Sequence, residues 1–276
     1  MSDPVIYTAV LPIGEPTAAF VSQLLAGERA RRGTRRGRRA LGCYRQAVLV
    51  LRWFLDATRV AQLAIDNQLG RSTTYRYLHE GIDVLAAAAP GLHGALLAAR
   101  AAGHTHVHLD GTLVRTDRSR ALGPNAGIDL WWSGKHRHHG GNIQVLTAPD
   151  GWPLWTSQVR PGREHDTTCA RTHDRLLDTL DDWTDQTHVV LADLGYEGEN
   201  TRLTCPFKAP PGGGLSVDQR AYNMLHSATR ALAERGNSIL KTTFRALRRV
   251  TLCPWRIGAI TAAALVLLHH EHGRTT

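Results

Sequence analysis

Three carboxylates lie at positions where a fold could bring them together around divalent metal ions. Asp110 ends the apolar stretch His106–Leu109, which alternates like a short strand. Asp193 ends a second apolar stretch, Val189–Ala192, and Glu234 falls within a long helical pattern. Two acids at strand ends and a third on a helix can hold a pair of metal ions, which is equipment for cutting and joining phosphodiester bonds.

The elements that must position these acids follow Gly103. The apolar alternation and the turn residues predict strands at 104–110, 128–132, 142–148, 152–159, 187–192 and 205–208. They also predict a helix at 167–180 capped by Asp166, and a long helix that a capping box of Ser216 and Gln219 opens and that runs, with a kink, to Arg249. This mixed α/β order is what a ribonuclease-H-like core requires. There the first and fourth strands lie side by side, so Asp110 and Asp193 would meet at one edge of the sheet.

The long helix predicts a polar, mostly basic face around Glu234. At about 100° per residue, Lys241 and Arg245 lie within about 20° of Glu234, and Arg230 within about 40°. Apolar residues are expected on the opposite side, at Leu225, Leu232, Ile239, Leu240 and Leu247. A solvated salt-bridge face explains this pattern equally well, because Arg230 and Glu234 form an i,i+4 pair.

The charge of the chain favours a polyanionic partner. Its 33 lysines and arginines exceed its 24 acids, for a formal net charge of +9. Seven arginines fall between Arg29 and Arg39, broken by two glycines, and we expect this run to be unpacked. It can bind a phosphate backbone because each neutralised phosphate releases counterions; a solvated linker is the alternative. The expected contacts are Arg35, Arg36, Arg38 and Arg39.

The next stretch is typical of a helix-turn-helix. A helix is predicted at 41–55, a second at 59–67 capped by Thr58, and a third at 73–85 capped by Ser72, with a tight turn at Leu69–Gly70. An ordinary helical hairpin is the alternative. The residues around the start of the third helix suit base edges and phosphates of DNA: Arg71, Thr73, Thr74, Tyr75 and Arg76.

These patterns predict three parts: an N-terminal segment with an arginine-rich linker (1–40), a helical DNA-binding domain (41–102, with a further helix at 92–101) and a catalytic domain (103–276). The four cysteines are far apart, so we expect them to be reduced and mostly buried, without a zinc site. The apolar run Ile257–Leu268 is too short to span a bilayer, and Met1–Leu11 lacks the basic region of a signal peptide. A cytoplasmic, nucleoid-associated protein is the expectation.

Five segments resemble the DDE transposases of bacterial insertion sequences, in the group related to the Harbinger transposases. They occur in the family's order: His108–Thr112, the pair Trp132–His136 and Gly141–Val145, Pro161–Asp166, Leu191–Tyr196, and the helix with Arg230, Glu234 and Lys241. The resemblance covers about Thr105 to Leu247, and the helix-turn-helix is similar to the family's N-terminal region. Leu194 departs from the family, which often has lysine there.

The resemblance implies that Asp110, Asp193 and Glu234 are metal ligands. Two Mg²⁺ ions, with Mn²⁺ as a substitute, would lie roughly 3.5–4 Å apart at the scissile phosphate. The implied reaction is hydrolysis at the transposon ends, followed by attack of the freed 3′-hydroxyl on target DNA. The implied partner is double-stranded DNA, bound by a homodimer or higher oligomer. His165 and Asp166 become active-site support.

The remaining basic residues give further expectations. The tract Lys135–His139 resembles a metal site, but near-contiguous histidines on a loop seldom form a zinc tetrahedron. We expect Lys135, His136 and Arg137 to lie near the DNA backbone, together with Arg230, Lys241 and Arg245. Two other functions stay open: a catalytically inactive, domesticated DNA-binding relative, and a two-metal nuclease that cuts without joining.

Overall fold

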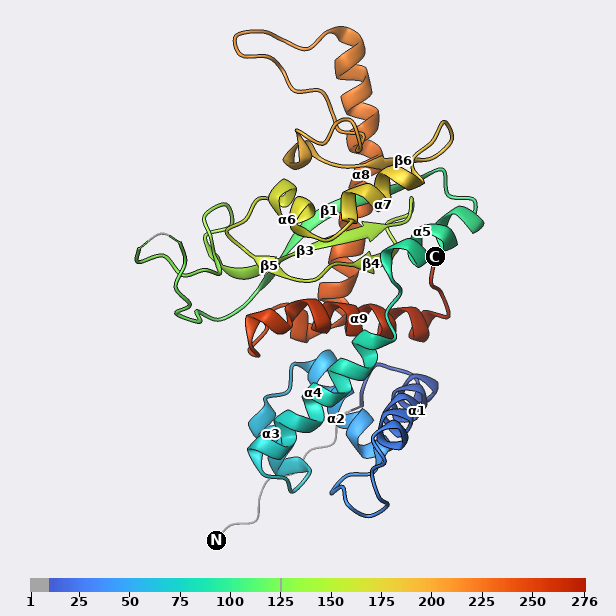
Figure 1. The fold of residues 1–276 in the computed structure, drawn as a ribbon, viewed down its shortest axis with the longest axis vertical. Helices are drawn as coiled ribbons and strands as arrows, with labels where there is room; N and C mark the ends of the chain where they lie inside the picture. The colour runs from blue at the N-terminus through green and yellow to red at the C-terminus, as the bar shows by residue number, and fades with distance from the viewer. Residues whose placement is uncertain (1–9, 125) are drawn as a thin grey trace.

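The computed structural model describes residues 10–124 and 126–276. A layer of helices and a mixed β-sheet pack on opposite sides of one apolar helix, α9 (Ile257–His272), as Figure 1 shows. A helix that is apolar on all sides is stable in water only when it is covered on all sides. Most of α9 from Ile257 to His269 is buried accordingly.

The layer below α9 in Figure 1 contains α1 (Glu15–Arg31), α2 (Cys43–Asp56), α3 (Val60–Asp66) and α4 (Arg71–Ala87). The three helices predicted between residues 41 and 85 are confirmed. The predicted caps are wrong, because Arg59 and Gly70 occupy the N-cap positions of α3 and α4 without a side-chain cap. Helix α1 was not expected, and the arginine run begins inside it.

Helix α5 (Leu92–Ala101) confirms the prediction of a helix at 92–101 but packs with the sheet rather than with the helical layer. The indole Nε1 of Trp183 donates to the carbonyl of Leu96 at 3.0 Å, and Arg100 donates to the carbonyl of Trp183 at 2.7 Å. The packing of the chain therefore changes near Pro90, before the boundary expected at residue 102.

The sheet has the strand order β2-β3-β1-β6, with β4 and β5 also paired to β3. Strand β1 (His106–Arg115) pairs antiparallel with β3 (His138–Thr147) and parallel with β6 (Val189–Leu191). The predicted pairing of the two acid-bearing strands is therefore confirmed. The shorter strands are β2 (Trp132–Ser133), β4 (Pro153–Thr156) and β5 (Arg160–Pro161).

Two strand predictions need correction. The strand expected at 128–132 is reduced to β2, because Asp129 instead accepts from the backbone N–H of Trp131 in a turn. The strand expected at 205–208 is a single bridge between Leu191 and Thr204, as far as the described residues show.

Helices cover both faces of the sheet. The helix predicted at 167–180 is two helices, α6 (Asp166–Thr172) and α7 (Leu176–Trp183), because Arg175 between them has a left-handed φ of 55°. Residue His165, not Asp166, is the N-cap of α6. Helix α8 (Val217–Thr243) begins at the predicted capping box and runs behind the sheet in Figure 1. It ends before Arg249, and two short 3₁₀ helices follow, η2 (Arg245–Leu247) and η3 (Pro254–Arg256).

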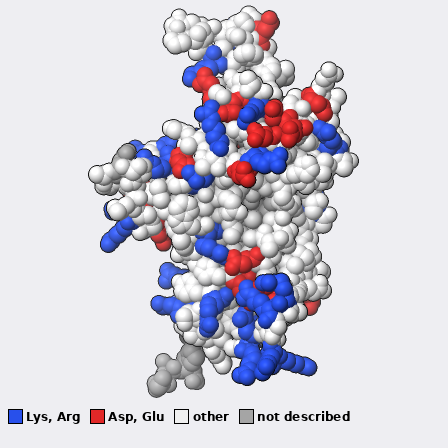
Figure 2. All heavy atoms as spheres, in the orientation of Figure 1, with Lys and Arg blue, Asp and Glu red and all other residues white. Residues whose placement is uncertain are grey.

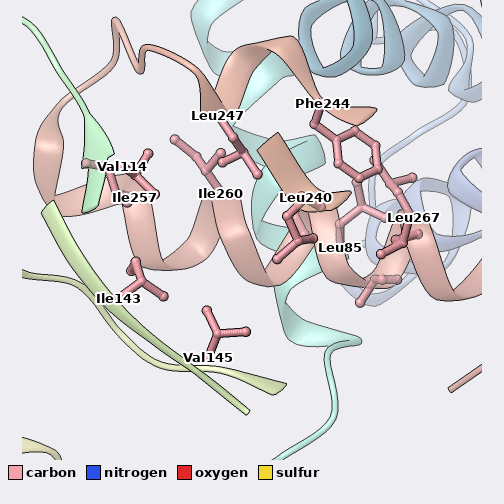
Figure 3. Close-up of a cluster of buried hydrophobic side chains, with 14 of the residues drawn as sticks. Leu85, Val114, Ile143, Val145, Leu240, Phe244, Leu247, Ile257, Ile260 and Leu267 are labelled. Carbon is pink, nitrogen blue, oxygen red and sulfur yellow. The ribbon is translucent and has the colours of Figure 1, made fainter. Parts of the chain in front are cut away.

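One apolar core extends from the helical layer to the sheet, with α9 at its centre. Figure 3 shows side chains of α8, η2, β3 and α9 gathered there, among them Leu240, Leu247, Ile143 and Ile260. Two leucines predicted on the buried side of α8 are exposed, Leu225 by 68% and Leu232 by 47%. Leu225 lies in the first half of α8, which projects past the sheet in Figure 1 and has no layer to bury it.

Other expectations concern cysteines and membranes. All four cysteines are free, but only Cys169 is buried and Cys253 is exposed. Among the described residues, no single helix is long and apolar enough to cross a bilayer; α4 and α5 reach that length and composition only as a pair bent by 48°. The expectation for Met1–Leu11 falls largely outside the described residues.

Candidate active site

Asp110 and Asp193 lie next to each other at one end of the sheet. In the parallel pairing of β1 with β6, His108 is opposite Leu191, and each acid follows two residues later. Residues two apart on a strand share a face, and neighbouring strands are about 4.8 Å apart. The Oδ1 atom of Asp193 also accepts from the backbone N–H of Gly195 at 2.8 Å, which fixes this carboxylate at the N-cap of η1 (Leu194–Tyr196).

Two side chains of α8 reach the acid pair. The guanidinium of Arg230 lies 3.6 Å from Asp110 and 4.0 Å from Asp193. The amide of Asn237 donates to Oδ2 of Asp110 at 2.8 Å. Arg230 was expected to contact DNA, and the structure corrects this, because its charge is turned inward between the two acids. The positions of Arg230 and Asn237 follow from seven-residue spacing, which puts both on the inner side of α8.

The environment of Asp110 favours its neutral form. Burial raises the pKa of Asp110 to about 6, the nearby Arg230 guanidinium opposes this rise, and the carboxylates of Asp193, Asp166 and Glu234 add to it. A carboxylate that is surrounded by other acids is costly to ionise unless a cation neutralises the group. The end of the sheet is therefore a place where added positive charge would be stabilising.

Glu234 is exposed on α8, one turn after Arg230. It is close enough to affect the pKa of Asp110, but in the described part of the chain no three acidic, histidine or cysteine side chains are grouped closely enough to hold a metal ion. The structure thus brings Asp110 and Asp193 together and leaves Glu234 exposed on α8, with Arg230 lying between the two half-buried acids.

A fourth carboxylate, Asp166, joins this end of the sheet. It accepts from the amide of Asn142 at 2.7 Å and lies 3.6 Å from the Lys135 ammonium. A Cβ on Gly111 would lie 2.1 Å from Oδ1 of Asp166, so only glycine after Asp110 leaves room for this acid. Asp166 thus lies beside the acid pair, whereas His165 is exposed.

A buried polar chain leads to Asp166 from the interior. The Tyr196 hydroxyl donates to the side-chain oxygen of Gln144, and Gln144 donates to Asn142 at 3.0 Å. Burial raises the pKa of Tyr196, and the carboxylates of Asp166 and Asp110 raise it further. We did not predict these residues. The available signal in the sequence was a pair of amide side chains, Asn142 and Gln144, two residues apart in the stretch expected to form a strand at 142–148.

Two basic residues of the last helix differ from their predicted places. Lys241 is largely buried and donates to Thr112 Oγ1 at 2.6 Å and to the carbonyl of Leu113 at 3.0 Å. Burial lowers the pKa of Lys241, and Asp110 opposes that change. Arg245 lies beyond the end of α8, in η2, and lines a hollow with Arg52 and Thr58. The prediction that Arg245 lies on the same face as Glu234 assumed that the helix continues to Arg249. The helix ends at Thr243, two residues before Arg245.

The basic tract between β2 and β3 remains at the surface. Lys135, His136 and Arg137 are exposed, and Lys135 and His136 line a hollow with His165 and Asp166. This places the loop beside the carboxylates. Burial and the neighbouring Lys135 lower the pKa of His136.

The arginine run is partly packed. Arg39 is half-buried; its guanidinium forms an ion pair with Glu80 and lies 4.8 Å from the centre of the Tyr77 ring. Arg39 is therefore a structural residue and not the free DNA contact that was expected. Arg35, Arg36 and Arg38 are exposed as expected. Figure 2 shows lysine and arginine side chains gathered over this lower, helical part of the molecule.

On α4, Arg71, Tyr75 and Arg76 are exposed and Thr73 is half-buried. Thr74 is fully buried and donates to the carbonyl of Gly70 at 3.1 Å, so the expectation that it touches DNA is wrong. The first turn of α4 packs against the protein on one side, and Thr74 is the residue of that turn that faces inward.

Comparison with known proteins adds one family match. Residues 109–269 match the family model described as DDE superfamily endonuclease, a range that contains all three candidate acids. No curated protein matches the chain. Two solved structures are similar at 12% identity and a TM-score of 0.21: a Mos1 transposase paired-end complex with left transposon end (98% of this chain, 82% of that chain) and a pre-cleavage Mos1 transpososome (88% and 81%). A TM-score this low is not evidence of a shared arrangement.

Proposed function

Because the chain belongs to the DDE superfamily endonuclease family, we propose that it is a DNA transposase. It binds transposon terminal repeats, hydrolyses a phosphodiester bond at each end, and joins the freed 3′-hydroxyl to target DNA. Its sheet is then a ribonuclease-H-like core. The observation that carries this proposal is the parallel register of β1 and β6, which sets Asp110 and Asp193 side by side.

The residues at this end of the sheet fit divalent magnesium. Hard cations such as Mg²⁺ take oxygen ligands, mainly carboxylates. The acids supply these, and Oδ1 of Asn237 is a buried oxygen that accepts no hydrogen bond from the described residues. Asp110, Asp193 and Glu234 would hold the ions, two Mg²⁺ or Mn²⁺. The bound ions would supply Lewis-acid activation of water and stabilisation of the leaving oxygen.

The chain's own groups prepare the site. Arg230 offsets the charge of Asp110 and Asp193 in the protein as it stands, and it must move aside for metal to enter. Glu234, on the same helix face as Arg230 and one turn later, then completes the set of acids. Asp166 is held by Asn142 and the polar chain behind it, so it is a positioning residue for this end of the sheet.

The reaction consists of two displacements at phosphorus. In the first, a water oxygen bonds to phosphorus, the bond to the 3′-oxygen of the transposon end breaks, and that oxygen leaves as a hydroxyl. In the second, this 3′-hydroxyl oxygen bonds to a phosphorus of the target and displaces a target 3′-oxygen. Neither displacement requires a covalent bond between protein and DNA.

DNA contacts are proposed for two regions outside the acids. The exposed residues of α4 would meet the major groove, with α3 and α4 as a helix-turn-helix, and Arg35, Arg36 and Arg38 would meet phosphates. Lys135, His136 and Arg137 would meet the backbone near the cut. The expected division was 41–102 as the DNA-binding part and 103–276 as the catalytic part. We propose the same two parts, with α1 added to the first and α5, which packs with the sheet, moved to the second. Two bound ends favour a homodimer or higher oligomer on DNA.

The test is Mg²⁺-dependent cleavage of a labelled duplex that carries the flanking terminal repeats. Wild type should cut, and Asp193→Asn should bind the duplex without cutting, because a ligand is lost and the DNA surface is unchanged. Arg202→Gln, which removes a partly exposed charge that pairs with Asp178 away from the site, is the control. Tight binding without cleavage by wild type, in Mg²⁺ or Mn²⁺, would contradict the proposal and favour an inactive DNA-binding relative. Cleavage without strand-transfer products would identify a nuclease that only cuts.

A further inference from the structure

A basic groove leads away from the acid pair along β1. Two adjoining hollows of about 310 and 340 Å³ share Arg115, His138 and Arg248, so together they form one channel. We call it the β1 groove. It begins at Gly111, directly after Asp110, and ends at Arg118.

The groove has a floor and two walls that are tied together by hydrogen bonds. Its floor is Gly111–Arg115 of β1 and the segment 116–118 that follows it. One wall is the segment 136–139, and the other is the segment 241–249, which contains the end of α8 and η2. The backbone N–H of Thr116 donates to His139 at 3.1 Å, and that of Val250 donates to Arg115 at 2.8 Å. The groove is therefore present before any ligand binds.

Positive charge is distributed over its whole length. The floor contributes Arg115 and Arg118, and the wall at 241–249 contributes Lys241, Arg248 and Arg249. Asp117 is the one acid that lines either hollow, and it pairs with Arg249 at 2.5 Å. A surface of this kind attracts a linear polyanion and repels a cationic ligand.

Two of these cations are available to a ligand. The side chains of Arg115 and Arg118 are exposed, and across residues 10–124 and 126–276 neither is held in a salt bridge. By contrast, Lys241 is bonded to Thr112 and Leu113, and Arg248 donates to the carbonyls of Lys241 and Thr242. Those two residues shape the wall, which leaves the floor arginines to meet phosphates.

The length of the groove suits several nucleotides. The backbone from Gly111 to Thr116 makes five residue-to-residue steps and extends about 17 Å. One strand of B-form DNA advances about 3.4 Å per phosphate, so about five phosphates fit along the groove. A single phosphate or a mononucleotide would leave most of it unfilled.

We propose that the β1 groove holds the backbone of the DNA strand that leads to the scissile phosphate, with Arg115 and Arg118 contacting its phosphates. This deepens the proposed function and takes the identity of the ligand from it. The strand enters past Arg118, runs over β1 between the two walls, and arrives at Asp110. The groove thereby fixes which phosphate of the strand meets the acids.

The test uses Arg115→Gln/Arg118→Gln beside a control, Arg202→Gln/Arg220→Gln, which removes two positive charges outside the groove, one exposed (Arg220) and one partly exposed (Arg202). Binding of a labelled random-sequence duplex and of a single strand is measured by anisotropy in EDTA, between about 50 and 200 mM salt. Each lost phosphate contact lowers the salt slope by about 0.9, so the groove variant should lose about 1.8 and bind about 60-fold more weakly at about 0.1 M salt. The control should keep the wild-type slope. Equal slopes for the two variants would overturn the proposal.

A second measurement locates the strand. Photo-reactive thymidine analogues, placed one at a time along either strand of a substrate duplex, should cross-link to 111–118 or 136–139 from consecutive positions of one strand. Cross-links from both strands alike would contradict a single-strand track.

The experiments distinguish a failure of the groove proposal from a failure of the proposed transposase activity. Wild-type cleavage together with unchanged binding and cutting by the groove variant would reject the groove and keep the enzyme. Arginine-dependent binding without any cleavage in Mg²⁺ or Mn²⁺ would keep the groove and reject the enzyme.

Discussion

In the absence of metal, the ionised carboxylate of Asp110 should lower the free energy of unfolding, and Asp110→Asn should raise it. The pKa of Asp110 is raised from 3.8 to about 6, mainly by burial. A folded-state pKa above the unfolded one means that the folded protein binds the extra proton, so the stability from this group is present below pH 4 and is lost as pH rises through 6. Its side chain is 17% exposed, so solvent screens the effect only in part.

The size of the effect follows from the shift. Each pKa unit corresponds to about 1.4 kcal/mol, so ionised Asp110 costs about 3 kcal/mol at pH 8 and about half of that at pH 5. Asparagine removes the charge and keeps an oxygen for the bond from Asn237. The free energy of unfolding of Asp110→Asn should therefore exceed that of wild type by about 3 kcal/mol at pH 8, and the difference should shrink at pH 5.

Urea unfolding in EDTA at both pH values measures this difference. Asp182→Asn, an exposed change on α7, is the control and should stay within about 0.5 kcal/mol of wild type. Mg²⁺ should stabilise wild type and not Asp110→Asn. A variant that is less stable than wild type at pH 8, or a difference that does not depend on pH, would refute the reasoning that burial keeps this carboxyl costly to ionise.

Two further predictions concern packing. Gly236→Ala should destabilise the fold by about 1–3 kcal/mol although alanine favours helices, because its Cβ would lie 2.6 Å from the carbonyl oxygen of Gly151. The matched change Gly27→Ala in α1 meets nothing within 4 Å and should stabilise by about 0.5–1 kcal/mol; the same sign for both in thermal unfolding would contradict this. Tyr196→Phe should cost about 1–3 kcal/mol in urea unfolding, because it leaves the Gln144 oxygen buried without its donor, and a loss below about 0.5 kcal/mol would show that water replaces the hydroxyl.

The sequence predicted most of what local pattern controls. Strand alternation located β1 and β6, the capping box located the start of α8, and helical periodicity located α2 to α5. The pairing of Asp110 with Asp193 followed because a parallel register carries two strand ends to one edge of a sheet. These features depend on neighbours in the chain or on a common topology.

What the sequence did not predict depends on distant partners. In the sequence, Arg39 and Arg230 cannot be told from surface arginines. Only the fold brings Arg39 to Glu80 and Arg230 to the acid pair. The end of α8 at Thr243 follows from the docking of Phe244 into the core, which no periodicity records. Arg245 consequently turns away from Glu234. Helix α1 has a weak amphipathic pattern, so only its packing against α2 and α4 explains it.

The position of α9 also affects how the protein forms during translation. Helices α1 and α4 of the helical layer and strand β4 of the sheet pack on α9, although α9 comes after all of them in the chain. About 170 residues separate the end of α4 from the start of α9, which corresponds to roughly 10–30 s of synthesis at typical rates. During that interval both layers expose the surfaces that α9 will cover. We therefore expect nascent chains that stop before Ile257 to bind chaperones or aggregate, and solubility to appear only when α9 has left the ribosome.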